Sequence, residues 1–160
     1  KLNDLSRGIN RTYLFYGSQE EQKKSTTSQS AADSLSQEAA PASGAERAAF
    51  KGSGRYRAKG DLIEALAGKK VKLQDLKEAE LPAELKKLSP KEREVYISEK
   101  QKERKQIQLQ IQELTKKRKQ FIAAEMKKQK NQAQDNTFDA AVIRVIRSQA
   151  KKKNFQFESE

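Results

Sequence analysis

The spacing of the apolar residues predicts a helix at the start of the chain, followed by an extended stretch. Leu2, Leu5 and Ile9 recur at helical spacing, so residues 1–11 are predicted to be helical. Residues 12–16 are β-branched, aromatic or aliphatic and end at Gly17, a pattern typical of a short strand. A single strand needs a partner, and the pattern further along the chain predicts none.

Residues 18–49 have a different character, because Ser, Gln, Ala and Glu dominate and Leu35 is the only large apolar residue. One interpretation is a flexible linker. The other is an Ala-rich helix over residues 19–40 that ends at Pro41. The sequence leaves both open, so we expect residues 18–56 to be either a linker or an Ala-rich helix.

Short helices are predicted after this stretch. Asp61 is a candidate N-cap for a helix that carries Leu62 and Ile63 and stops at Gly68. Another short helix can begin at Pro82, since proline is favoured in the first helical turn.

A single long helix is predicted over residues 90–130. Ser89 and Glu92 have the spacing of a capping box, and Pro90 suits the first helical position. Residues 90–130 contain no Gly and no Pro after Pro90, so the helix would be about 60 Å long at 1.5 Å per residue. Its apolar seam covers about two heptads and is interrupted by Arg118 and Glu125, which predicts packing on a neighbouring helix rather than a long dimeric coiled coil.

A terminal helix is predicted over about residues 137–152, with Thr137 as its cap and Asn154 at its end. We expect it to pack as an antiparallel hairpin on the Ile107–Met126 face of the long helix. The candidate packing and interaction residues are those of the two apolar faces: Ile107, Ile111, Leu114, Phe121, Ile122, Met126, Phe138, Val142, Val145 and Ile146. The predicted fold class is therefore all-α, with a long helix packed by a C-terminal helix, short helices before it and a flexible N-terminal part.

Composition adds an elongated shape to this picture. Only 34% of the residues are hydrophobic, whereas 35% are charged and 6% are aromatic. This hydrophobic fraction is low for a globular core and predicts an elongated molecule, or an ordered part beside a flexible one. No run approaches the ~18 apolar residues of a membrane span.

The sequence offers little for catalysis. Cys and His are absent, which excludes disulfides, thiolate metal sites and the commonest general base. The glycines around Ser53 lack the spacing of a phosphate-binding loop, and Asp4 begins a metal-type D-x-S-x-S pattern that fails at Gly8. We therefore predict a non-enzymatic chain, with no catalytic residue and no cofactor or metal site in this segment.

The net charge of +12 raises one alternative function. Residues 91–130 hold 13 Lys and Arg against 6 Asp and Glu, a difference of 7, and the densest run is Lys116, Lys117, Arg118 and Lys119. These four residues are candidate anion contacts, and such a helix could bind nucleic acid through its phosphates. No zinc finger, RRM aromatic pair or KH loop accompanies them, so a basic helical nucleic-acid-binding module is the alternative to a structural role.

Several segments resemble one family. Residues 10–17, N-R-T-Y-L-F-Y-G, resemble the N-x-T-Y-x-x-Y-G segment at the exit of the von Willebrand factor type A (vWA) domain in a group of bacterial proteins. Residues 61–65, 80–85 and 88–93 resemble the W-D-L-V-D-A, E-L-P-x-x-L and L-S-P-x-E-R segments of the extension that follows that domain. Gly60 stands where an aromatic residue is common, and residues 138–142 and 154–157 also match in kind.

The resemblance implies a domain organisation and a role. Residues 1–17 would end an upstream vWA-like domain, and residues 57–160 would be a helical C-terminal region. A divalent cation would be held by a D-x-S-x-S motif upstream, outside these residues. The implied role is a non-catalytic segment that positions or mediates contacts with a protein partner, in an exported setting such as the periplasm or the cell surface.

Overall fold

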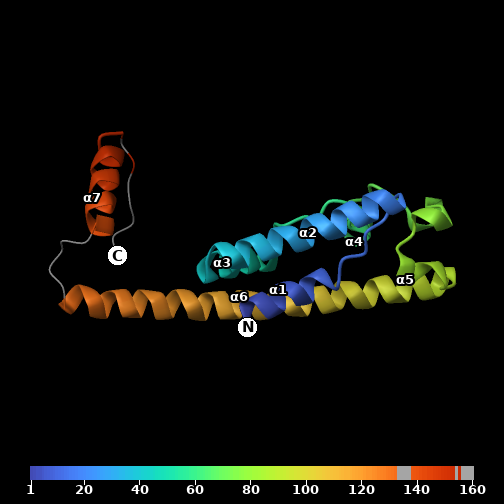
Figure 1. The fold of residues 1–160 in the computed structure, drawn as a ribbon, viewed down its shortest axis with the longest axis horizontal. Coiled ribbons are helices and arrows are strands. Elements are labelled where there is room, and N and C mark those ends of the chain that lie inside the picture. Colours follow the sequence, from blue (N-terminus) through green and yellow to red (C-terminus); the bar gives the residue numbers. More distant parts are fainter. Residues whose placement is uncertain (133–137, 154, 156–160) are drawn as a thin grey trace. The chain divides into compact units, whose positions relative to one another are not determined.

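In a computed structural model, which describes residues 1–132, 138–153 and 155, the chain is all-α, as predicted (Figure 1). Its α-helices in chain order are α1 (Leu2–Asn10), α2 (Gln19–Ala39), α3 (Pro41–Gly52), α4 (Leu62–Ala67), α5 (Ala83–Lys86), α6 (Pro90–Gln132) and α7 (Phe138–Lys151). Two short 3-10 turns, η1 (Leu73–Asp75) and η2 (Glu78–Glu80), lie between α4 and α5. None of the described helices is long and apolar enough to cross a bilayer.

The chain divides into two compact units, Lys1–Lys117 and Arg118–Glu160. The sequence instead predicted boundaries near residues 17 and 56. The difference arises because the extended segment after α1 packs against the loop before α4 and against α6, which joins residues on both sides of each predicted boundary. The helix α6 contributes residues to both units.

Residues 19–39 and 41–52 are helical in the structure, so the helix alternative holds over these residues. Ser18 and Glu21 form a capping box at the start of α2, in which the Ser18 amide donates to Glu21 Oε2 at 2.8 Å. The chain breaks at Ala40, which is extended, and Pro41 occupies the first turn of α3. Helices α1, α2 and α3 pack on one another.

The apolar core of the first unit gathers side chains from four segments and is formed by Leu14, Leu62, Ile63, Leu81, Leu85 and Ile97. Leu14 belongs to the stretch predicted as a lone strand. That stretch is extended, but it has a partner that the sequence did not indicate: Phe15 bridges to Asp61, and the Leu62 amide donates to the Leu14 carbonyl at 2.8 Å.

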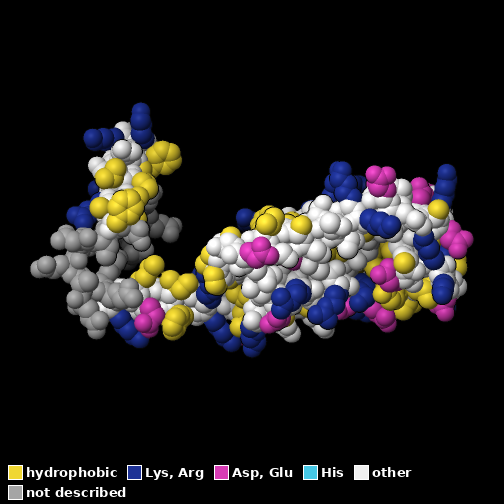
Figure 2. Space-filling view, in the orientation of Figure 1, with side chains coloured by type: hydrophobic (Ala, Val, Ile, Leu, Met, Phe, Trp, Pro, Cys, Tyr) yellow, Lys and Arg dark blue, Asp and Glu magenta, His cyan; other side chains and the backbone are white. Residues whose placement is uncertain are grey.

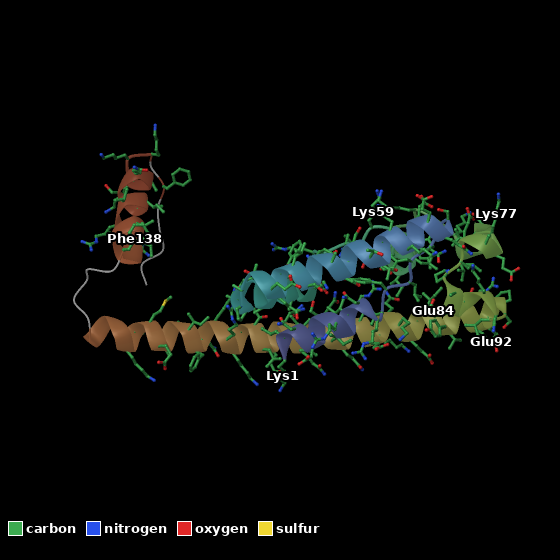
Figure 3. The ribbon with its side chains drawn as sticks, viewed as in Figure 1. Lys1, Lys59, Lys77, Glu84, Glu92 and Phe138 are labelled. Carbon is green, nitrogen blue, oxygen red and sulfur yellow. The ribbon has the colours of Figure 1, made fainter. Side chains whose placement is uncertain are left out.

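Helix α6 begins as the sequence predicted. The Ser89 amide donates to Glu92 Oε2 at 2.8 Å, and Glu92 lies in the first turn, close to α5 (Figure 3). Its covered positions recur every three or four residues, and they include charged side chains as well as apolar ones: Arg93, Ile97, Lys100, Arg104, Ile107, Ile111 and Leu114.

Part of this seam is covered by the N-terminal helices α1 and α3. A Cβ on Gly8 of α1 would lie 3.3 Å from Ile107 Cδ1, and a Cβ on Gly52 of α3 would lie only 2.3 Å from Ile111 Cγ2. Helices α1 and α3 therefore cover Ile107 and Ile111, which the sequence assigned to the contact with the terminal helix.

Helix α7 closely matches the predicted range. Thr137 and Asn154, which the sequence predicted at the two ends of this helix, lie outside the described residues. On its apolar face, Phe138 is 81% exposed and Ile146 is 56% exposed. Hydrophobic side chains are accordingly visible on the surface of α7 (Figure 2).

Candidate functional site

A buried ion pair joins α6 to the loop before α4. Arg104 Nη1 donates to Asp61 Oδ2 at 2.6 Å, and Arg104 Nη2 donates to Asp61 Oδ1 at 3.1 Å. The two side chains are 6% and 0% exposed. A two-point contact between a guanidinium and a carboxylate is among the strongest hydrogen-bonded arrangements in proteins, and it fixes orientation as well as distance.

The same guanidinium holds the extended segment after α1. Arg104 Nε donates to Thr12 Oγ1 at 3.0 Å, and Arg104 Nη2 donates to the Thr12 carbonyl at 2.7 Å. The Arg104 Cζ atom lies 4.8 Å from the centre of the Tyr13 ring, in cation–π geometry. We call Thr12, Tyr13, Asp61 and Arg104 the Arg104 clamp, because one side chain of α6 fastens two distant segments.

Asp61 accepts two further hydrogen bonds that complete the clamp. Its carboxylate accepts from the Leu14 amide at 3.1 Å and caps α4 by accepting from the Glu64 amide at 3.4 Å. The buried charges of Arg104 and Asp61 are thus paired. Removing either one would leave the other charge buried without a partner. Burial also raises the pKa of Tyr13 well above its ordinary value, so its phenol remains neutral and is unsuited to act as a general base.

A second buried ion pair joins α1, α2 and α3. Lys51 Nζ lies 2.6 and 2.7 Å from the two carboxylate oxygens of Asp33, and it donates to Asn10 Oδ1 at 2.8 Å and to Ser6 Oγ at 3.1 Å. Arg47 also pairs with Asp33. We call these five residues the Lys51 cluster. The Lys51 side chain is 0% exposed.

Burial and pairing act in opposite directions on the Lys51 cluster. Burial lowers the pKa of Lys51 to about 8, and hydrogen bonding to Asp33 offsets this only in part. At Asp33 burial raises the pKa, but hydrogen bonds from Lys51, Arg47 and Asn10 outweigh it, so the pKa falls below the ordinary value. A lysine with a lowered pKa can act as a nucleophile, but a side chain without solvent exposure cannot meet a substrate. The geometry of Lys51 therefore suits cohesion of the three helices.

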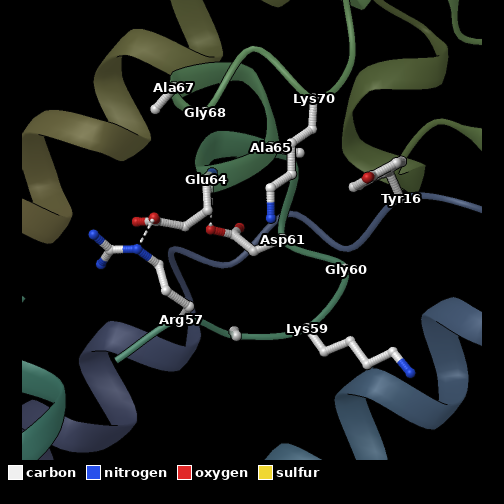
Figure 4. A pocket seen from close by; sticks show the side chains of 11 residues that line it. Tyr16, Arg57, Lys59, Gly60, Asp61, Glu64, Ala65, Ala67, Gly68 and Lys70 are labelled. Atoms are coloured by element: carbon white, nitrogen blue, oxygen red, sulfur yellow. Dashed lines mark hydrogen bonds and ion pairs between the residues drawn. The ribbon is translucent and has the colours of Figure 1, made fainter. Parts of the chain in front are cut away.

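A cavity of about 480 Å³ lies beside the Arg104 clamp (Figure 4). Its carboxylates are Asp61 and Glu64, and Arg57 Nε pairs with Glu64 Oε2 at 2.8 Å. Both carboxylates are therefore engaged by arginines rather than positioned toward a substrate. In the part of the chain that the structure describes, no group of three or more acidic, His or Cys side chains is gathered to hold a metal ion.

The structure separates the residues that the sequence proposed as one packing surface. Ile111 is buried, and Ile107 and Leu114 are partly buried in the first unit. The others belong to the second unit, where Ile122 is partly buried and the remaining six are exposed: Phe121, Met126, Phe138, Val142, Val145 and Ile146.

The four consecutive basic residues of α6 do not lie on one side of the helix. Each residue of a helix advances by about 100°, so four consecutive residues spread around most of the circumference. Lys117 Nζ is paired with Glu113 Oε1 at 2.6 Å, and Arg118 is partly buried, while Lys116 and Lys119 are exposed. The four candidate anion contacts therefore do not form one stripe.

The sequence interpretation missed Arg104, Lys51 and Asp33. Arg104 lies seven residues after Ile97 and seven before Ile111, both of which are buried. An arginine in register with two buried isoleucines is a signal for a buried, paired cation, and it could have extended the predicted seam toward the start of α6.

Comparison of the chain with protein-family models, curated proteins and solved structures gave no match.

Proposed function

We propose that the chain is a non-catalytic structural segment that follows a vWA-type domain and positions or mediates protein contacts. The observation that carries this proposal is the Arg104 clamp. It ties Thr12, which follows α1, to the long helix α6 through a side chain 92 residues away. A domain joined to α1 would thereby keep a fixed direction relative to the first part of α6.

The segments that carry the family resemblance also support the proposal, because they lie together in space. Leu14, Leu62, Leu81 and Leu85 come from three of those segments and share one core. In addition, the Gly17 amide donates to the Glu80 carbonyl at 2.9 Å, which joins the first segment to the third. Residues that resemble one family in order and spacing thus also act as one packing unit.

The upstream part of the proposal is tested by the coding sequence that precedes the codon for Lys1. We expect it to encode an apolar strand followed by D-x-S-x-S within about 200 residues, one domain length. That motif would hold the divalent cation, and an export signal would agree with the proposed periplasmic or surface setting. An upstream sequence that encodes a different kind of domain would contradict the vWA proposal.

A basic helical nucleic-acid-binding module is the second candidate. The exposure of Lys116 and Lys119, on a helix with a large excess of basic residues, favours it. The spread of the basic run around α6 argues against it, because phosphates along one duplex face would meet only part of the run.

Retention on heparin and affinity for duplex DNA, measured across a salt series, distinguish the two candidates. The structural proposal predicts weak binding at physiological salt, with no difference between Lys116→Gln/Lys119→Gln and a matched variant of two exposed α2 lysines, Lys23→Gln/Lys24→Gln. Micromolar binding with a steep salt slope that only the first variant reduces would favour the nucleic-acid module instead.

A further inference from the structure

Helix α7 is amphipathic, and its two faces differ in chemistry as well as in polarity. At about 100° per residue, Phe138, Val142, Val145 and Ile146 project from one side of the helix. Arg144, Arg147 and Lys151 follow one another at spacings of three and four residues on the other side. Large apolar side chains on this helix are more than one-third exposed, and Phe138 lies at its first turn (Figure 3).

The charge of this region indicates what covers the apolar face. Residues 138–153 contain five Lys and Arg and one Asp, a net charge of +4. Lys151, Lys152 and Lys153 are consecutive and exposed at the end of the helix. An apolar face combined with a cationic face suits a surface that is itself apolar and anionic, whereas a nucleic acid would leave the apolar side chains in water.

We propose that α7 binds the surface of an anionic membrane. Its apolar face would lie among the acyl chains near the headgroups, and the exposed Lys151, Lys152 and Lys153 would extend to the lipid phosphates. The helix would lie in the plane of the surface, because its 14 residues span about 21 Å, less than the ~30 Å hydrocarbon core. This inference concerns the second unit and does not depend on the role proposed for the first.

The test uses the full 160-residue chain and sedimentation with vesicles of phosphatidylcholine, either alone or with one-third phosphatidylglycerol. We expect binding to the anionic vesicles that weakens with salt, and much weaker binding to the neutral ones. Each of Lys151→Gln, Lys152→Gln and Lys153→Gln should lower the partition coefficient about fivefold, the effect of ~1 kcal/mol for each charge near the surface.

The apolar face is tested separately. Val142→Asp/Ile146→Asp should abolish vesicle binding. The matched control is Val95→Asp/Leu109→Asp, which changes two similarly exposed apolar residues of α6 (52% and 56%) and should bind normally. Because the chain has no Trp, Phe138→Trp supplies a single reporter, whose emission should shift to the blue on anionic vesicles and remain unshifted in the Val142→Asp/Ile146→Asp background.

Three outcomes would overturn the proposal. One is equal binding to neutral and anionic vesicles. Another is unchanged binding by the Val142→Asp/Ile146→Asp variant. The third is absence of vesicle binding. That result overturns the proposal even if the chain self-associates, or binds polyglutamate as a probe for an acidic protein groove.

Discussion

Arg104 contacts two segments that are far from it in sequence, and its environment explains why a single charged side chain can organise the first unit. The guanidinium is almost fully removed from water, yet its three nitrogens are hydrogen-bonded to Thr12 and Asp61. A buried ion pair adds little stability over a well-packed apolar pair, but losing one partner is costly because the other charge remains buried.

Replacing this arginine should therefore reduce stability strongly. We expect Arg104→Met to lower the free energy of unfolding by about 3–5 kcal/mol, measured by urea denaturation. Exposed Lys105→Met is the matched control and should change it by less than about 0.5 kcal/mol. The double variant Arg104→Met/Asp61→Asn should cost clearly less than the sum of the two single changes. Additive costs would show that the two residues do not form the pair described above.

The Lys51 cluster predicts a pH dependence on the alkaline side. The pKa of Lys51 falls from 10.5 to about 8 on folding, so between these pH values the unfolded chain binds a proton that the folded chain has released. Stability relative to Lys51→Met should therefore rise with pH across this window, by at most about 1.4 kcal/mol per pH unit.

Urea denaturation of both proteins at several pH values between 7 and 10.5 measures this difference. Lys24→Met, at an exposed position of α2, is the matched control and should show no such trend relative to the parent. A difference that instead falls with pH would mean that pairing with Asp33 outweighs burial and raises the pKa of Lys51.

At the scale of the element, local signals such as capping predicted the helices correctly. The packing of helix faces that mix apolar and charged residues was predicted poorly. The capping box at Ser89 and the absence of Gly fixed the start and extent of α6 because both act within the helix itself. The seam of α6 was harder to see, since Lys100 and Arg104 occupy covered positions that a pattern of apolar residues counts as solvent-facing. For residues 18–49, composition alone is compatible with a linker or a helix, and tertiary contacts through Asp33 and Gln29 favour the helix.

Of the described glycines, Gly52 of α3 would bring an added Cβ nearest to a neighbouring side chain, Ile111 of α6. Because an added Cβ would lie 2.3 Å from Ile111 Cγ2 and 2.7 Å from Ile111 Cβ, Gly52→Ala should force the helices apart and cost about 1–3 kcal/mol. Thermal unfolding measures the change.

Gly8→Ala is the matched control at the neighbouring contact. Its added Cβ would lie 3.3 Å from the flexible end of Ile107, and alanine favours a helix over glycine by about 1 kcal/mol, so the net change should be small. If both variants lose the same stability, close approach at Gly52 is not the cause. Partial recovery in Gly52→Ala/Ile111→Ala would support it.

On the scale of the whole molecule, the described core residues and both buried clusters lie within Lys1–Lys117. A chain that ends at Lys117 should therefore unfold cooperatively, with a midpoint within a few degrees of that of the full chain, because it retains all of these contacts. Circular dichroism during heating measures the midpoint. A broad transition or a large drop would show that the second unit stabilises the first.

The candidate site belongs to this scale too, which is why the sequence could not reveal it. Thr12 and Arg104 are 92 residues apart, and Asp61 and Arg104 are 43 residues apart. Periodicity and capping describe neighbours along the chain and contain no information on such pairs. For the same reason the sequence identified Ile107 and Ile111 as apolar positions but did not predict that α1 and α3 cover them.

The central claim is that the Arg104 clamp fixes the segments after α1 to the long helix. A distance distribution between two spin labels tests it most directly, and the absence of Cys allows labels at Glu20 and Lys105, both exposed, after substitution by Cys. We predict one narrow distribution in the labelled parent, a broad one after Arg104→Met, and a narrow one after the control change Lys102→Met. A broad distribution in the parent, or a narrow one that persists after Arg104→Met, would contradict the claim.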